Sequence, residues 1–105
     1  MKKYYVYGLK DPETGEIRYV GKSPNPKNRY KEHVAEARTA SRTEKQRWIA
    51  GLLARSLHPS LVILATAPDE PAARELEAEF CHLHIATVLN IHDPRKGAKD
   101  LRKRA

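Results

Sequence analysis

The chain has 105 residues, of which 40% are hydrophobic and 31% are charged, and its formal net charge is +7. This length suits one domain with its own core, and no apolar run approaches the roughly 20 residues that cross a bilayer. Charge at Lys10 and Asp11 rules out a signal peptide, and the single cysteine, Cys81, rules out an internal disulfide, so we expect a cytoplasmic protein.

Two segments near the N-terminus have the composition of β-strands. Residues 3–9 are rich in aromatic and β-branched side chains, and residues 16–21 alternate polar and apolar side chains. Turn-forming residues occupy 11–15 between them. We expect an antiparallel hairpin, and pairing about the middle of this turn places Tyr7 directly opposite Tyr19 on one face.

Capping signals and apolar spacing predict three helices after the hairpin. The first runs from Pro26 to about Arg38, the second begins at Thr43, and the third runs from about Pro71 to Ile85. The expected N-caps are Asn25, Thr43 and Asp69. The expected inner faces are Tyr30, Val34 and Ala37 in the first helix, Trp48, Ile49, Leu52 and Leu53 in the second, and Leu76, Phe80 and Leu83 in the third.

A continuous apolar run over residues 61–65 is typical of a buried central strand, and residues 88–91 form a last short apolar piece. The order β-β-α-α-β-α predicts an α+β fold, with a small three-stranded antiparallel sheet flanked by three helices. We expect this domain to occupy residues 1–94 and to be followed by a flexible basic tail over residues 95–105.

Most of the net charge lies in that tail. Residues 95–105 hold six basic side chains and one acidic one, a net of +5, which leaves +2 for the rest of the chain. A basic segment of this kind favours a polyanionic partner, most commonly nucleic acid. A solvated chain end with no partner is the alternative.

Five short motifs occur in order along this predicted fold. They are Tyr5-Val6-Tyr7 and Tyr19-Val20-Gly21-Lys22 in the hairpin, Arg29 with His33 four positions later in the first helix, Glu77 in the third helix, and Leu89-Asn90 after it. Together they resemble the motifs of the GIY-YIG nuclease family over about residues 4–92. Tyr5 replaces the glycine of the family's first motif, but the tyrosine of that motif is present as Tyr7.

The resemblance implies a metal-dependent endonuclease that hydrolyses phosphodiester bonds in nucleic acid. DNA is the expected substrate and RNA the alternative, and one divalent ion, Mg²⁺ or Mn²⁺, is expected on Glu77. The implied catalytic residues are Tyr7, Tyr19, Arg29, His33 and Glu77. Further contacts to the substrate are expected from Lys22, Asn90, Arg95 and Lys96.

The chemistry of these side chains is consistent with that reaction. Arg29 and His33 share one helix face, where the guanidinium can bind two phosphate oxygens and the imidazole can accept a proton. We expect Tyr7 to act as the base or to position water, with His33 taking the proton onward. Tyr19 then positions the phosphate, and Lys22 helps Arg29 to stabilise charge. Mg²⁺ commonly takes only one or two carboxylates, so a single glutamate at the edge of the third helix's apolar stripe suffices.

Each of these residues also has an ordinary structural interpretation. Isolated tyrosines most often pack, and an arginine, histidine or glutamate on a helix is most often solvated. A second cluster, Cys81, His82 and His84 with His92, lacks the paired spacing of a zinc site. We expect Cys81 to be an inert core thiol.

Two other functions fit the same sequence. The first is a catalytically silent module that binds nucleic acid on the same scaffold, and the second is a structural domain whose basic tail recruits an acidic protein. For an endonuclease of this length we expect low intrinsic sequence specificity, with structure-guided or single-strand-preferring cleavage, or reliance on a partner protein that provides specificity.

Overall fold

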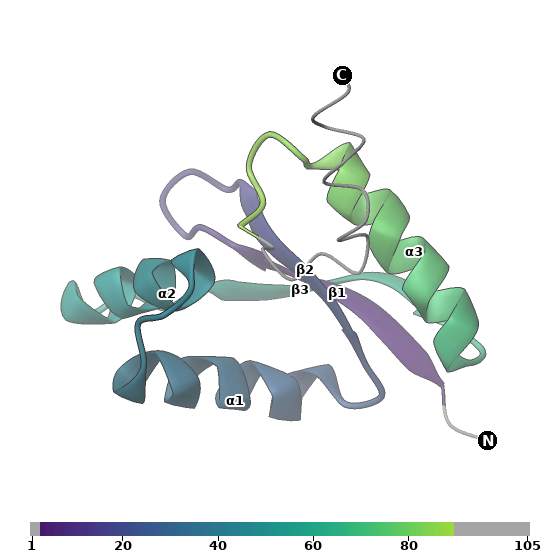
Figure 1. Ribbon diagram of the computed structural model, residues 1–105, viewed down its shortest axis with the longest axis horizontal. Helices are drawn as coiled ribbons and strands as arrows, with labels where there is room; N and C mark the ends of the chain where they lie inside the picture. Colours follow the sequence, from purple (N-terminus) through teal and green to yellow (C-terminus); the bar gives the residue numbers. More distant parts are fainter. Residues whose placement is uncertain (1–2, 90–105) are drawn as a thin grey trace.

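The computed structural model describes residues 3–89, which form an α+β fold with the predicted order of elements. The strands are β1 (Tyr4–Lys10), β2 (Ile17–Ser23) and β3 (Ser60–Ala67), and the helices are α1 (Pro26–Thr39), α2 (Glu44–Ala54) and α3 (Glu70–Leu83). The sheet is antiparallel with the order β2-β1-β3. Helices α1 and α2 lie on one face and α3 on the other (Figure 1).

The three predicted N-caps are confirmed, and they explain where the helices begin. Asn25 accepts a hydrogen bond from the Asn28 backbone N–H at 3.1 Å, and Asp69 accepts one from the Ala72 N–H at 3.0 Å. Thr43 forms a complete capping box at the start of α2. Each cap satisfies N–H groups that the first helical turn leaves unpaired.

The prediction of a buried central strand over residues 61–65 is wrong, because β1 is the central strand and β3 lies at one edge. The apolar run in β3 reflects packing on both faces of the sheet rather than a central position. Val62 and Leu64 pack against the α3 side, and Leu61 packs against the α1/α2 side. Ile63 remains 52% exposed, as an edge position permits.

The predicted register of the hairpin is also wrong, by two residues. Tyr7 pairs with Gly21 and Tyr19 pairs with Leu9. The loop closes where the Asp11 N–H donates to the Glu16 carbonyl, and a β-bulge beside Lys10 then adds one residue to β2. A shift of two keeps side chains on the same face, so the two tyrosines still point to the α1/α2 side.

Two hydrophobic clusters, one on each face, form the core. The α3-side cluster consists of Val6, Ile17, Val20, Ala67, Ala73 and Cys81. The α1/α2-side cluster consists of Tyr7, Leu9, Tyr19, Ala37 and Ile49. The inner face of α2 was predicted well, since Ile49 and Leu52 are fully buried.

The predicted inner faces of α1 and α3 need correction. His33 is buried in α1, whereas Val34 is only half-buried. In α3 the buried residues are Ala73, Glu77 and Cys81, and Leu83, which was expected to face inward, is 69% exposed. The small side chains of Ala73 and Cys81 let α3 approach the sheet closely, and Leu76 and Phe80 pack at the border of the same cluster.

The segment after α3 returns to β2. Thr87 donates its hydroxyl proton to the Ile17 carbonyl at 2.7 Å, and the Leu89 N–H donates to the Arg18 carbonyl at 2.6 Å. The predicted tail over residues 95–105, and Asn90, Arg95 and Lys96, lie outside the described residues. Within residues 3–89, no helix has the length and apolar character that a membrane span requires.

Candidate active site

Gly21 provides the space in which two phenols meet. A Cβ atom built at this position would lie 2.5 Å from the Tyr7 hydroxyl oxygen and 3.0 Å from Cε2 of Tyr19. Tyr7 therefore extends from the central strand across the backbone of its neighbour, where a side chain would otherwise stand. The rings of Tyr7 and Tyr19 come to 6.3 Å between centroids. The glycine is required here for close approach, not for its own conformation.

His33 completes the phenol pair from α1. Its Nε2 atom lies 2.7 Å from the Tyr7 hydroxyl oxygen, and its ring meets Tyr19 edge-on at 5.0 Å between centroids. The histidine is fully buried. It lies on the same helix face as the buried Pro26 and Ala37, so the packing of α1 on the sheet aims the imidazole at the hairpin.

Lys45 is a buried member of this group that sequence reasoning missed. Its Nζ atom lies 3.0 Å from Nδ1 of His33 and 4.8 Å from the centroid of the Tyr19 ring, in cation–π geometry. The residue is only 8% exposed. A signal was present in the sequence, because Lys45 shares the buried stripe of α2 with Ile49 and Leu52, at i, i+4 and i+7.

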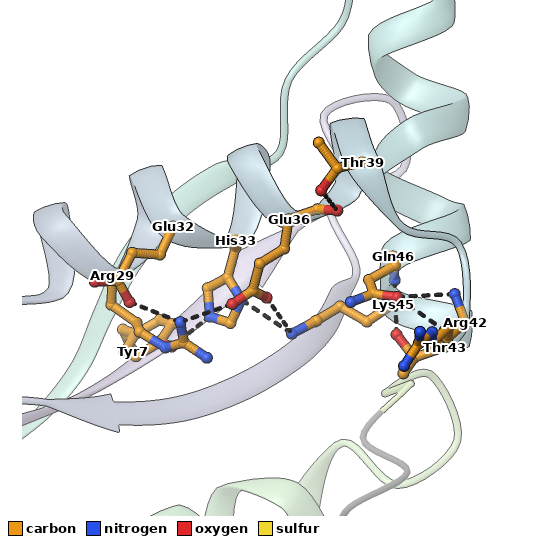
Figure 2. Close-up of polar contacts among 10 residues, drawn as sticks. All are labelled: Tyr7, Arg29, Glu32, His33, Glu36, Thr39, Arg42, Thr43, Lys45 and Gln46. Atoms are coloured by element: carbon orange, nitrogen blue, oxygen red, sulfur yellow. Dashed lines mark hydrogen bonds and ion pairs between the residues drawn. The ribbon is translucent and has the colours of Figure 1, made fainter.

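Two acidic residues of α1 connect these groups to Arg29 (Figure 2). Glu32 accepts from the Arg29 guanidinium at 2.8 Å, and Glu36 accepts from the same nitrogen at 3.4 Å. The other carboxylate oxygen of Glu36 lies 4.0 Å from the ammonium of Lys45. Glu36 therefore bridges the two cations, and this role was also not predicted.

Glu77 approaches the phenols from α3. It is 6% exposed, on the buried face of the helix rather than at its edge as predicted. Its charge adds to the increase in the pKa of both Tyr7 and Tyr19. Tyr19 lies on β2, which is an edge strand of the sheet.

Lys22 lies apart from the phenols. It follows Gly21 in β2, and its ammonium pairs with Glu70 in the first turn of α3 at 3.3 Å. Glu70 also binds Arg74, one helical turn later. A phosphate near Lys22 would therefore compete with an existing ion pair.

Burial is the main cause of the raised pKa values of both tyrosines. The two phenols therefore stay neutral to a higher pH than an exposed tyrosine, because a charged phenolate loses much of its hydration in this environment. For Tyr7, the nearby Tyr19 and Glu77 add to the increase, and the Arg29 guanidinium opposes it. Arg29 is thus the positive charge in place to stabilise negative charge on the Tyr7 oxygen.

The structure therefore brings two phenols, an imidazole and a guanidinium together on this fold, with a buried acid in α3. The chain matches the GIY-YIG catalytic domain over residues 3–88, most of its length, and it therefore belongs to the GIY-YIG family. Neither the curated proteins nor the solved structures gave a match to this chain.

The carboxylate of Glu77 is better suited to bind a hard divalent ion than zinc. Within residues 3–89 there is no cluster of three or more His, Cys, Asp or Glu side chains that could hold a metal. A dehydrated zinc site needs several such ligands, whereas Mg²⁺ keeps most of its waters and uses one or two carboxylates. The buried carboxylate of Glu77 fits that second pattern.

Proposed function

We propose that this protein is a metal-dependent endonuclease that hydrolyses phosphodiester bonds in DNA, with low intrinsic sequence specificity. Its membership of a family of nuclease catalytic domains supports the nuclease activity. The observation that carries the proposal for this chain is the 2.7 Å contact between Tyr7 and His33, with Arg29 hydrogen-bonded to the Tyr7 side chain. This combination brings a proton-handling pair and a phosphate-binding cation to one place.

In the proposed mechanism each side chain acts on a different part of the reaction. Tyr7 positions the attacking water through its hydroxyl group, and the Arg29 guanidinium stabilises negative charge beside the phenolic oxygen. Tyr19 contacts the phosphate. Arg29 exchanges its bonds with Glu32 and Glu36 for phosphate oxygens, which it binds in a planar, two-point geometry.

Glu77 is the proposed ligand for one Mg²⁺ or Mn²⁺ ion. When bound, such an ion stabilises the negative charge of the leaving oxygen. Glu77 is buried on the inner face of α3 rather than in bulk solvent, and its charge contributes to the raised pKa of Tyr19.

A plasmid-nicking assay with Mg²⁺, with Mn²⁺ and with EDTA tests this function. We expect cleavage with either metal and none with EDTA. Glu77→Ala should abolish cleavage, while DNA binding stays mostly intact. We expect the cleavage rate to fall roughly 1000-fold or more, because the group acts on charge that develops during the reaction. The matched control is Glu79→Ala, which removes an acid from a less buried position of the same helix.

Two results would contradict the proposal in different ways. Cleavage by Glu77→Ala at the rate of the parent protein would remove the metal assignment. Salt-dependent binding of DNA with no cleavage of single-strand, duplex or branched substrates would identify a catalytically silent binding module instead.

A further inference from the structure

The immediate surroundings of Lys45 explain how an ammonium is kept inside the protein. The α2 capping box, in which Gln46 accepts from the Thr43 N–H at 3.2 Å, fixes the first turn of the helix that carries it (Figure 2). Burial lowers the pKa of Lys45, the charge of Glu36 opposes that decrease, and the charge of Arg29 adds to it. The carboxylate of Glu36 and the face of the Tyr19 ring both favour the charged form.

We propose that Lys45 is a positioning residue that selects the protonation form of His33. A lysine ammonium has three donors and no acceptor. In the 3.0 Å contact between Lys45 Nζ and His33 Nδ1, the lysine must therefore donate and Nδ1 must accept. A nitrogen that accepts carries no proton, so the imidazole is neutral and holds its one proton on Nε2.

The protonation form of His33 determines how it hydrogen-bonds to Tyr7. With its proton on Nε2, His33 donates to the Tyr7 hydroxyl oxygen at 2.7 Å instead of accepting from it. The phenol's own proton is then directed away from His33. Partial negative charge on the phenolic oxygen of the intact hydroxyl is stabilised by this hydrogen bond and by Arg29. The sequence-based assignment, in which His33 takes a proton from Tyr7, requires the opposite tautomer.

The expected effect of Lys45 on cleavage rests on the proposed nuclease function. The assignment of the His33 tautomer does not. The tautomer itself can be measured in a protein that cuts nothing. Long-range ¹H–¹⁵N correlation spectra distinguish Nε2–H, Nδ1–H and imidazolium forms of each histidine. The signals of His33 are assigned by their loss in His33→Gln.

We expect the full-length protein at neutral pH to show His33 in the Nε2–H form. Lys45→Met, which keeps the length of the side chain but removes the donors, should shift His33 toward a mixture with Nδ1–H. Lys45→Arg, whose guanidinium also has donors and no acceptor, should keep the Nε2–H form. Arg47→Met removes an exposed cation from the same helix and should leave the spectrum unchanged.

An Nδ1–H or imidazolium signal in the parent protein would overturn the proposal, whether or not Lys45→Met folds. An unchanged tautomer in a folded Lys45→Met protein would overturn it as well. In the nicking assay, Lys45→Met should lower kcat by about 10- to 100-fold, as loss of an orienting partner does, with little change in KM and with partial recovery in Lys45→Arg. A parent protein that shows the Nε2–H form but cleaves no substrate would contradict the nuclease function and leave the tautomer assignment standing.

Discussion

The two faces of the sheet are built from different chemistry. On the α3 side, small and aliphatic residues such as Val6, Ala73 and Cys81 form an apolar cluster beside a buried acid, Glu77. On the α1/α2 side, the buried groups include a polar chain that runs from Tyr7 through His33 to Lys45. Buried polar groups are expensive unless all are paired, so the polar chain on one face and the buried acid on the other are the candidates for function.

The largest difference in stability and cleavage between the two faces is expected when a glycine on each face is replaced by alanine. Gly21→Ala places a Cβ against the Tyr7 hydroxyl at 2.5 Å, and the buried ring has little room to move. We expect destabilisation by about 1–3 kcal/mol and a loss of cleavage of roughly 100-fold, because small displacements of reacting groups have effects of that size. Urea denaturation and the nicking assay measure the two effects.

Gly8→Ala is the counterpart on the α3 side. Its Cβ would meet only the tips of aliphatic side chains, the nearest being Cδ1 of Ile17 at 3.1 Å. Stability should change by no more than about 1 kcal/mol, and cleavage per folded molecule should stay close to that of the parent. Equal losses of cleavage in the Gly8 and Gly21 variants would show that the two faces do not differ in function.

Alkaline pH should destabilise the α1/α2 side selectively. The pKa values of Tyr7 and Tyr19 are raised in the folded protein, mainly by burial, so unfolded chains ionise near pH 10 while the folded phenols stay neutral. The stabilising effect is fully present below about pH 10 and is lost as the pH rises above it, by roughly 1.4 kcal/mol per pH unit for each tyrosine.

A double variant, Tyr7→Phe with Tyr19→Phe, should flatten that decline in urea denaturation series from pH 9 to pH 11. Lys45 remains present in both proteins, so the opposite slope caused by its lowered pKa cancels in the comparison. A decline of the same steepness in the double variant would show that other groups cause it.

The smallest change in DNA binding is expected when basic residues of the tail are substituted. Arg95→Ala with Lys96→Ala should weaken DNA binding and reduce the slope of log K against log salt by about 2, roughly one for each phosphate that a removed cation would neutralise. Binding titrations between low and moderate salt measure this slope. The same salt dependence in parent and variant would remove these two residues from the set of predicted DNA-binding residues.

Local signals were sufficient to predict most of the fold. Strand alternation, the Asn25 and Asp69 caps and the capping box at Thr43 depend on neighbouring residues, and the structure has each of them. The register of the hairpin was not predictable by the same means, because a bulge beside Lys10 adds a residue without a clear local signature.

The candidate site was predicted in part. Family motifs indicated Tyr7, His33 and Arg29, and the structure brings these side chains together. The involvement of Lys45 and Glu36 was missed because a charged residue in a polar helix is usually solvated. The burial of Lys45 and its contacts with His33 and Glu36 follow from the packing of α1 against α2, which is a tertiary contact.

Cleavage of supercoiled plasmid by Tyr7→Phe, compared with Tyr4→Phe, tests the central claim most directly. Both changes remove a single hydroxyl from β1, but of the two tyrosines it is Tyr7 that bonds to His33, whereas Tyr4 packs against the α3-side cluster. We expect Tyr4→Phe to nick the plasmid in Mg²⁺ as fast as the parent protein and Tyr7→Phe to leave it supercoiled. Nicking by Tyr7→Phe at the parent rate would contradict the assignment of the Tyr7–His33 pair to the active site.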